Sequence, residues 1–95
     1  MKVYCVCHKF DVEGDYDFEV KSVHVIKDCA IKEMENLFNL KKNILEAKGY
    51  KLDLYTSKEN DVKSITINDK DVIMWFICER EVNLDGGLIP LKKMD

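Results

Sequence analysis

Hydrophobic and polar positions alternate over several short stretches of the chain, as they do in β-strands that bury one face. Residues 2–10 are apolar at most positions on both faces, which is typical of a central strand. Residues 18–27 form a second stretch, rich in β-branched side chains. We expect these two strands to make a hairpin with a long tip, residues 11–17, that contains Gly14.

A single long helix is predicted after the hairpin. Asp28 is a suitable N-cap, the pattern continues to about Lys48, and Gly49 fits the left-handed position that follows a helix. The apolar residues that share one stripe are Ala30, Ile31, Met34, Leu37, Phe38, Ile44 and Leu45. Lys41 falls within this stripe, so its stem snorkels, the helix bends near Asn39, or the amine has a function.

Three further strands are predicted at residues 50–56, 62–67 and 72–82, with turns at 57–61 and 68–71. The last strand begins with a continuous apolar run that includes Trp75, as expected for a strand buried on both faces. The order is ββαβββ. Short connections make neighbouring strands antiparallel, so we predict an α+β fold in which one long helix covers one face of a five-stranded, mainly antiparallel sheet.

The length of 95 residues suits one domain, which we place at residues 1–85. Residues 86–95 contain Gly86, Gly87 and Pro90 and are not expected to form a sheet strand. Their apolar residues Leu88, Ile89 and Leu91 need cover. This tail is therefore predicted to dock on the domain or on a partner, which includes a second copy of the chain as a homodimer.

Charge and composition narrow the classes of partner. The formal net charge is −3, and Arg80 is the only arginine, so bulk attraction to nucleic acid and bidentate base reading are both disfavoured. No apolar run reaches the ~20 residues that span a bilayer, and no secretory signal opens the chain. We therefore expect a cytoplasmic protein without a membrane partner, in which the four cysteines are thiols.

The most unusual feature is an acidic tip. Five carboxylates occupy alternate positions and would share one side of an extended chain: Asp11, Glu13, Asp15, Asp17 and Glu19. Tyr16 and Phe18 would point the other way. An EF-hand is excluded because its sixth and twelfth positions are Tyr16 and Ser22 here. A solvated edge, an acidic surface for a basic protein partner and an irregular calcium site remain open.

Other candidate chemistry is sparse. Cys5 and Cys7 lack the spacing of a zinc site, and His8 would point away from both on a strand, so we predict no metal and no cofactor. His8 and His24 have no evident catalytic partner, and no motif for a nucleophile or a phosphate loop is present, so an enzyme is not expected. Lys41 and Arg80 are alternative ligand-binding residues.

Residues 1–6, MKVYCV, followed by an acidic hairpin and a lysine-rich helix, resemble the opening of small uncharacterised proteins of phages and mobile elements, which commonly begin M-K-V-Y-x-V. The resemblance covers roughly residues 1–50. In size and charge that class is similar to phage inhibitors of bacterial defences, including anti-CRISPR proteins and sponges for nucleotide signals. It implies a bacterial or phage-infected host cell and carries no binding residue onto this chain.

These observations lead to one hypothesis and one alternative. The leading hypothesis is a non-catalytic acidic protein, phage-encoded as the resemblance implies, that inhibits a bacterial defence protein by binding its basic surface. Its contact residues would be Asp11, Glu13, Asp15, Tyr16, Asp17 and Phe18. The alternative is an oligomeric sponge that sequesters a nucleotide signal through Lys41 and Arg80.

Overall fold

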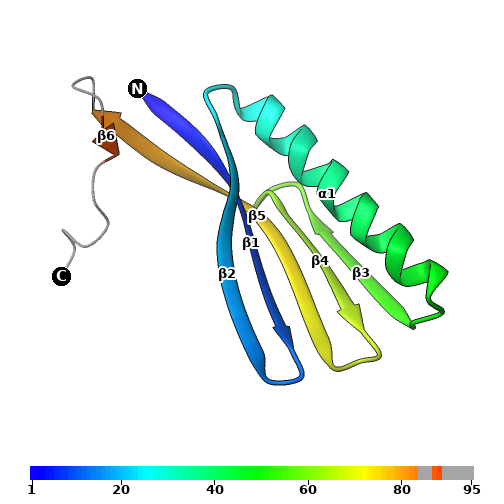
Figure 1. Ribbon diagram of the computed structural model, residues 1–95. Coiled ribbons are helices and arrows are strands. Elements are labelled where there is room, and N and C mark those ends of the chain that lie inside the picture. Colours follow the sequence, from blue (N-terminus) through cyan, green and yellow to red (C-terminus); the bar gives the residue numbers. More distant parts are fainter. Residues whose placement is uncertain (84–86, 89–95) are drawn as a thin grey trace.

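The alternating stretches pair into one antiparallel sheet that carries a single helix on one face (Figure 1). The computed structural model describes residues 1–83 and 87–88. Its strands are β1 (Lys2–Val12), β2 (Asp15–His24), β3 (Leu52–Ser57), β4 (Val62–Ile67), β5 (Asp71–Asn83) and the short β6 (Gly87–Leu88). The five long strands lie in the order β2-β1-β5-β4-β3, so the predicted α+β fold and its ββαβββ order are confirmed.

The helix α1 (Lys27–Ala47) packs its apolar stripe against the sheet and forms the main core with it. The buried members of this core are Val6, Ala30, Met34, Phe38, Leu45, Ile65, Ile67, Ile73 and Trp75. Trp75 lies on β5, the central strand, and the ring of Phe38 meets it edge-on at 5.8 Å between centroids. Burying each such side chain contributes about 1.5–3 kcal/mol, which makes this interface the main source of stability.

The ends of α1 agree only in part with the predicted signals. The N-cap is Ile26, which makes no side-chain cap, so the assignment of this role to Asp28 is wrong by two residues. Asp28 lies instead in the first turn, where a carboxylate interacts favourably with the helix dipole. The C-terminal signal is confirmed, because Gly49 follows the helix with a φ of +82°.

The hairpin of β1 and β2 is tighter than its sequence suggests. Strand β1 extends to Val12 and β2 begins at Asp15. The tip is therefore a two-residue turn rather than the predicted connection over 11–17. Glu13 and Gly14 both have positive φ, 52° and 85°, as a type I′ turn requires. This turn was not predicted from the sequence because glutamate rarely takes a left-handed conformation.

The other boundaries shift by a few residues. The second strand ends at His24 instead of residue 27, the third spans Leu52–Ser57, and the last spans Asp71–Asn83. The expectation that the tail holds no strand is wrong, because β6 pairs with the end of β5. The predicted docking of the tail also rests on Ile89 and Leu91, which lie outside the described part of the chain.

The register of the sheet separates a helix-covered face from an opposite face that we call the open face. Residues directly opposite each other in an antiparallel pair share a face. A register shift between Val6 and Cys7 leaves Lys21 without a partner, so Lys21 is the extra residue of a β-bulge. The open face carries Val3, Cys5 and Cys7 of β1, Tyr16, Phe18, Val20 and Val23 of β2, and Val72, Met74, Phe76 and Cys78 of β5.

Candidate functional site

The acidic tip lies at the end of the β1–β2 hairpin, and its turn divides the carboxylates between the two faces. Asp11 pairs with Tyr16 and so lies on the open face, whereas Asp15 and Asp17 pair with Val12 and Phe10 of the helix-covered face. The expectation that all the carboxylates share one side is therefore wrong. It assumed an extended chain through Gly14, where the chain actually reverses.

The tip is nevertheless acidic on both faces and accessible. Four acidic residues, Asp11, Glu13, Asp15 and Asp17, stand within residues 11–17 without a basic residue among them, and all four are exposed. None of the four forms an ion pair with another residue in the described part of the chain. Their charge is thus available to a partner, and it falls within one short surface where a basic group would be attracted.

An apolar strip on the open face of β2 begins beside these charges. Tyr16, Phe18, Val20 and Val23 are 67%, 48%, 52% and 53% exposed. Phe18 touches Phe76 of β5 with 6.0 Å between ring centroids, so the strip continues towards the centre of the sheet. Large apolar side chains gathered at this exposure mark contact surfaces more often than solitary ones do. The structure therefore places the predicted Tyr16 and Phe18 together with Val20 and Val23, which the sequence analysis missed.

A separate cavity of about 220 Å³ lies on the other face, between α1 and the sheet. Its lining residues come from four elements: His8 of β1, Lys21 of β2, Leu37, Leu40, Lys41 and Ile44 of α1, and Trp75 of β5. The lysine that interrupts the apolar stripe of the helix thus reaches a cavity. Arg80, the other alternative ligand residue, pairs with Val3 on the open face and donates a hydrogen bond to the carbonyl of Glu79 at 2.8 Å. Lys41 and Arg80 therefore lie on opposite faces of the sheet.

His8 forms part of the wall of this cavity. Its ring lies 5.3 Å from the ring of Trp75 and 5.9 Å from that of Phe10, measured between centroids. The residue is only 9% exposed, and its Nδ1 is buried without a hydrogen-bond partner among the described residues. Burial and the nearby ammonium of Lys21 lower the pKa of His8, and Glu19 opposes them. His8 is thus an unsatisfied, neutral imidazole near neutral pH.

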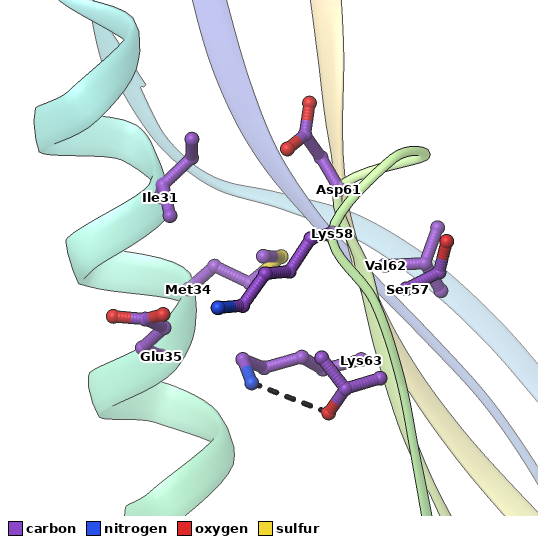
Figure 2. Close-up of a pocket in the computed structure, with 9 residues that line it drawn as sticks. Ile31, Met34, Glu35, Ser57, Lys58, Asp61, Val62 and Lys63 are labelled. Carbon is purple, nitrogen blue, oxygen red and sulfur yellow. Dashed lines mark hydrogen bonds between the residues drawn. The ribbon is translucent and has the colours of Figure 1, made fainter.

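A second cavity of about 220 Å³ lies between α1 and the β3–β4 hairpin, as Figure 2 shows. Ile31 and Met34 form its apolar side. Two of the charged groups around this cavity have polar partners. Lys27 forms an ion pair with Asp61 at 3.1 Å, and Lys63 donates a hydrogen bond to Thr56 Oγ1 at 3.3 Å. The first contact ties the hairpin to the helix and the second joins the two strands of the hairpin, which are structural roles.

The four cysteines are distributed over three elements: Cys5 and Cys7 on β1, Cys29 on α1 and Cys78 on β5. Cys5 is directly opposite Cys78 in the register, and all four cysteines are free. Burial, together with Cys78, raises the pKa of Cys7 to about 12, so its thiol stays protonated and unreactive. Within residues 1–83 and 87–88, no group of three or more histidine, cysteine or acidic side chains is arranged to hold a metal ion.

No protein-family model, curated protein or solved structure matches this chain. In the part of the chain that the structure describes, no helix has the length and apolar character of a membrane span.

Proposed function

We propose that the protein is a non-catalytic binding protein that attaches to the basic surface of another protein through the tip of its β1–β2 hairpin. The observation that carries this proposal is the adjacency of unpaired acidic side chains and an exposed apolar strip on one hairpin. Apolar anchors beside complementary charge are the common composition of protein interfaces. The occupant is a basic protein because four exposed carboxylates, Asp11, Glu13, Asp15 and Asp17, stand at the hairpin tip where the apolar strip begins.

The contact would divide its roles by side chain. Tyr16 and Phe18 would be the apolar anchors, since both stand on the open face at the charged end of β2. The carboxylates would mainly speed the encounter, because clustered charge steers association more than it holds a complex. The resemblance of residues 1–50 to proteins of phages and mobile elements makes a bacterial defence protein the partner class to test first, with inhibition as the outcome.

The alternative, a nucleotide sponge, needs a different arrangement from the one expected. Lys41 and Arg80 lie on opposite faces of the sheet, so they cannot contact one small ligand within one chain. An oligomer that brings Lys41 of one copy near Arg80 of another would be required. The hairpin surface needs no second copy and therefore supports the protein-binding function better.

The test uses a variant in which the tip is neutral: Asp11→Asn, Glu13→Gln, Asp15→Asn and Asp17→Asn. A matched control removes four charges elsewhere: Glu33→Gln, Glu35→Gln, Glu46→Gln and Glu59→Gln. A protein captured from a bacterial lysate is purified, and its association with parent, variant and control is measured at ~0.05 M and ~0.15 M salt, between which screening increases.

The neutral-tip variant should associate at least about tenfold more slowly, and the control should behave as the parent does. The rate of the parent should also fall as salt rises, whereas that of the variant should change little. If variant and control bind the captured protein as the parent does, the tip is only a solvated edge and the proposed function is wrong.

A further inference from the structure

The cavity beside His8 has an uncompensated positive charge. Lys21 is neutralised by Glu19, whose Oε1 lies 2.6 Å from its Nζ. Lys41 has no carboxylate within 4.0 Å among the described residues, although its side chain is half-buried. An ammonium without a counterion at the wall of an apolar cavity attracts an anion more strongly than one in open solvent does.

The remainder of the wall is apolar. Leu37, Leu40 and Ile44 come from α1 and Trp75 comes from β5, so much of the lining offers contact to carbon atoms. Small-molecule sites commonly combine such a wall with a few polar groups that fix orientation. The cavity of about 220 Å³ is smaller than the ~300–1,000 Å³ that drug-sized ligands occupy, so its ligand is small.

Two features of the local fold determine which polar groups, besides Lys41, lie at the cavity. The β-bulge at Lys21 places an unpaired residue of the sheet next to the cavity, and bulges commonly direct a side chain into a site. His8 contributes an imidazole that is nine-tenths buried and lacks a hydrogen bond, because Oε1 of Glu19 is 3.6 Å from its Nδ1. An unsatisfied buried polar group costs stability. A negative charge in the cavity favours the imidazolium form of this ring.

We infer that this cavity binds a small organic anion, with its carboxylate or phosphate beside Lys41 and Lys21 and its compact apolar body on Leu37, Leu40, Ile44 and Trp75. The site is independent of the proposed protein contact, since it lies under α1 on the opposite face of the sheet from the exposed strip. A bound anion also stabilises the imidazolium form of His8, which faces Glu19 and Asp17 on β2 and the ammonium groups of Lys21 and Lys41.

The test titrates the protein with phenyl phosphate and with phenylacetate and follows two signals. One is the fluorescence of Trp75, the only tryptophan of the chain. The other is the pair of imidazole resonances in proton NMR, which His24→Gln assigns. At least one of the two probes should change both signals saturably below ~10 mM, the range of weak specific sites, and should raise the pKa of His8. The probe that binds identifies the anionic group as phosphate or carboxylate.

Matched variants and a neutral probe separate the site from general charge effects. Lys41→Gln should weaken binding by about tenfold or more, as the loss of a charge-assisted contact does. Lys32→Gln removes the same charge on the opposite side of α1, nine residues away, and should leave the affinity unchanged. Thermal melting checks that both variants fold.

Three results would overturn the inference. In the first, neither probe shifts His8 at ~10 mM. In the second, Lys41→Gln binds as tightly as Lys32→Gln. In the third, benzyl alcohol, which lacks the charge, binds as well as the anionic probes. None of these results depends on whether the hairpin tip binds a protein.

Discussion

Nδ1 of His8 lies 3.6 Å from Oε1 of Glu19, beyond hydrogen-bond distance, while the ring itself is buried against Trp75. The imidazole therefore gains little from the carboxylate and loses the solvation that its charged form requires. This balance lowers the pKa of His8 below its ordinary value of 6.5. The consequence is a dependence of stability on pH in a range where few other groups titrate.

The first prediction concerns that dependence. Because the folded state holds His8 with a lowered pKa, the unfolded chain binds more protons, and the free energy of unfolding falls as pH drops below 6.5. The carboxylates whose pKa is lowered, Glu19, Asp69 and Glu81, remain charged above about pH 5, so they add little in this window. Urea unfolding at about pH 7 and pH 5 should show lower stability at the acidic value.

Two variants separate His8 from the second histidine. His8→Gln should remove most of the loss between about pH 7 and pH 5, because the titrating group is gone. His24→Gln leaves His8 in place and should retain the loss. An equal loss in His8→Gln and in the parent would show that another group is responsible.

The second prediction concerns the thiols. Cys29 is exposed on α1, whereas Cys5 and Cys7 are buried and the pKa of Cys7 is raised to about 12. A disulfide reagent at about pH 8 should therefore modify Cys29 first and reach Cys7 only when the protein unfolds. Cys29→Ser should abolish the fast phase, and Cys7→Ser should preserve it. Loss of the fast phase in Cys7→Ser would contradict the expected burial of Cys7.

The type and order of the elements were predictable because long apolar patterns dominate them. The alternation of residues 2–10 and the apolar run around Trp75 need no tertiary information to indicate central strands. The prediction that His8 points away from Cys5 and Cys7 is also confirmed, since His8 pairs with Trp75 on the helix-covered face. A period of two was sufficient there.

The site was less predictable because two local irregularities determine it. The reversal at Glu13 and Gly14 puts the carboxylates on both faces, and only the φ of Glu13 in the folded state reveals it. The bulge at Lys21 places Val23 on the open face, whereas simple alternation from Phe18 would place it on the helix-covered face. The one usable signal in the sequence was Lys41, a charge within an apolar stripe, because this residue lines the cavity. The pattern did not predict that His8 and Lys21 line it too.

The third prediction concerns the hairpin turn. Gly14 has a φ of +85°, and a Cβ at this position would meet nothing within 4 Å, so Gly14→Ala carries only a conformational cost, about 1–2 kcal/mol. Glu13→Asn should stabilise the protein, because asparagine tolerates the left-handed conformation and Asn-Gly favours this turn. Gly49→Ala is the matched control for Gly14→Ala, because Gly49 has a φ of +82° and a Cβ there would also meet nothing within 4 Å. Urea midpoints that do not separate Glu13→Asn from the parent would count against the turn type.

The fourth prediction separates folding from binding on the two faces of the sheet. Trp75 is 2% exposed and belongs to the main core, so Trp75→Ala should cost about 3–5 kcal/mol and leave the protein largely unfolded at moderate temperature. Phe18 is 48% exposed and has a single aromatic neighbour, Phe76, at 6.0 Å. Phe18→Ala should therefore cost only about 0.5–1.5 kcal/mol.

The two aromatic residues should consequently differ in what each substitution changes. If the strip beside the acidic tip is the contact surface, Phe18→Ala should keep its circular dichroism spectrum and yet dissociate from the captured partner about tenfold faster or more, as interface anchors do. Val25→Ala removes a comparably exposed apolar side chain, 62% exposed and one residue beyond the end of β2, and should dissociate as the parent does. Equal dissociation rates for Phe18→Ala and Val25→Ala would mean that the exposed phenyl ring is not an anchor. A loss of stability in Phe18→Ala as large as that of Trp75→Ala would mean instead that Phe18 serves the fold.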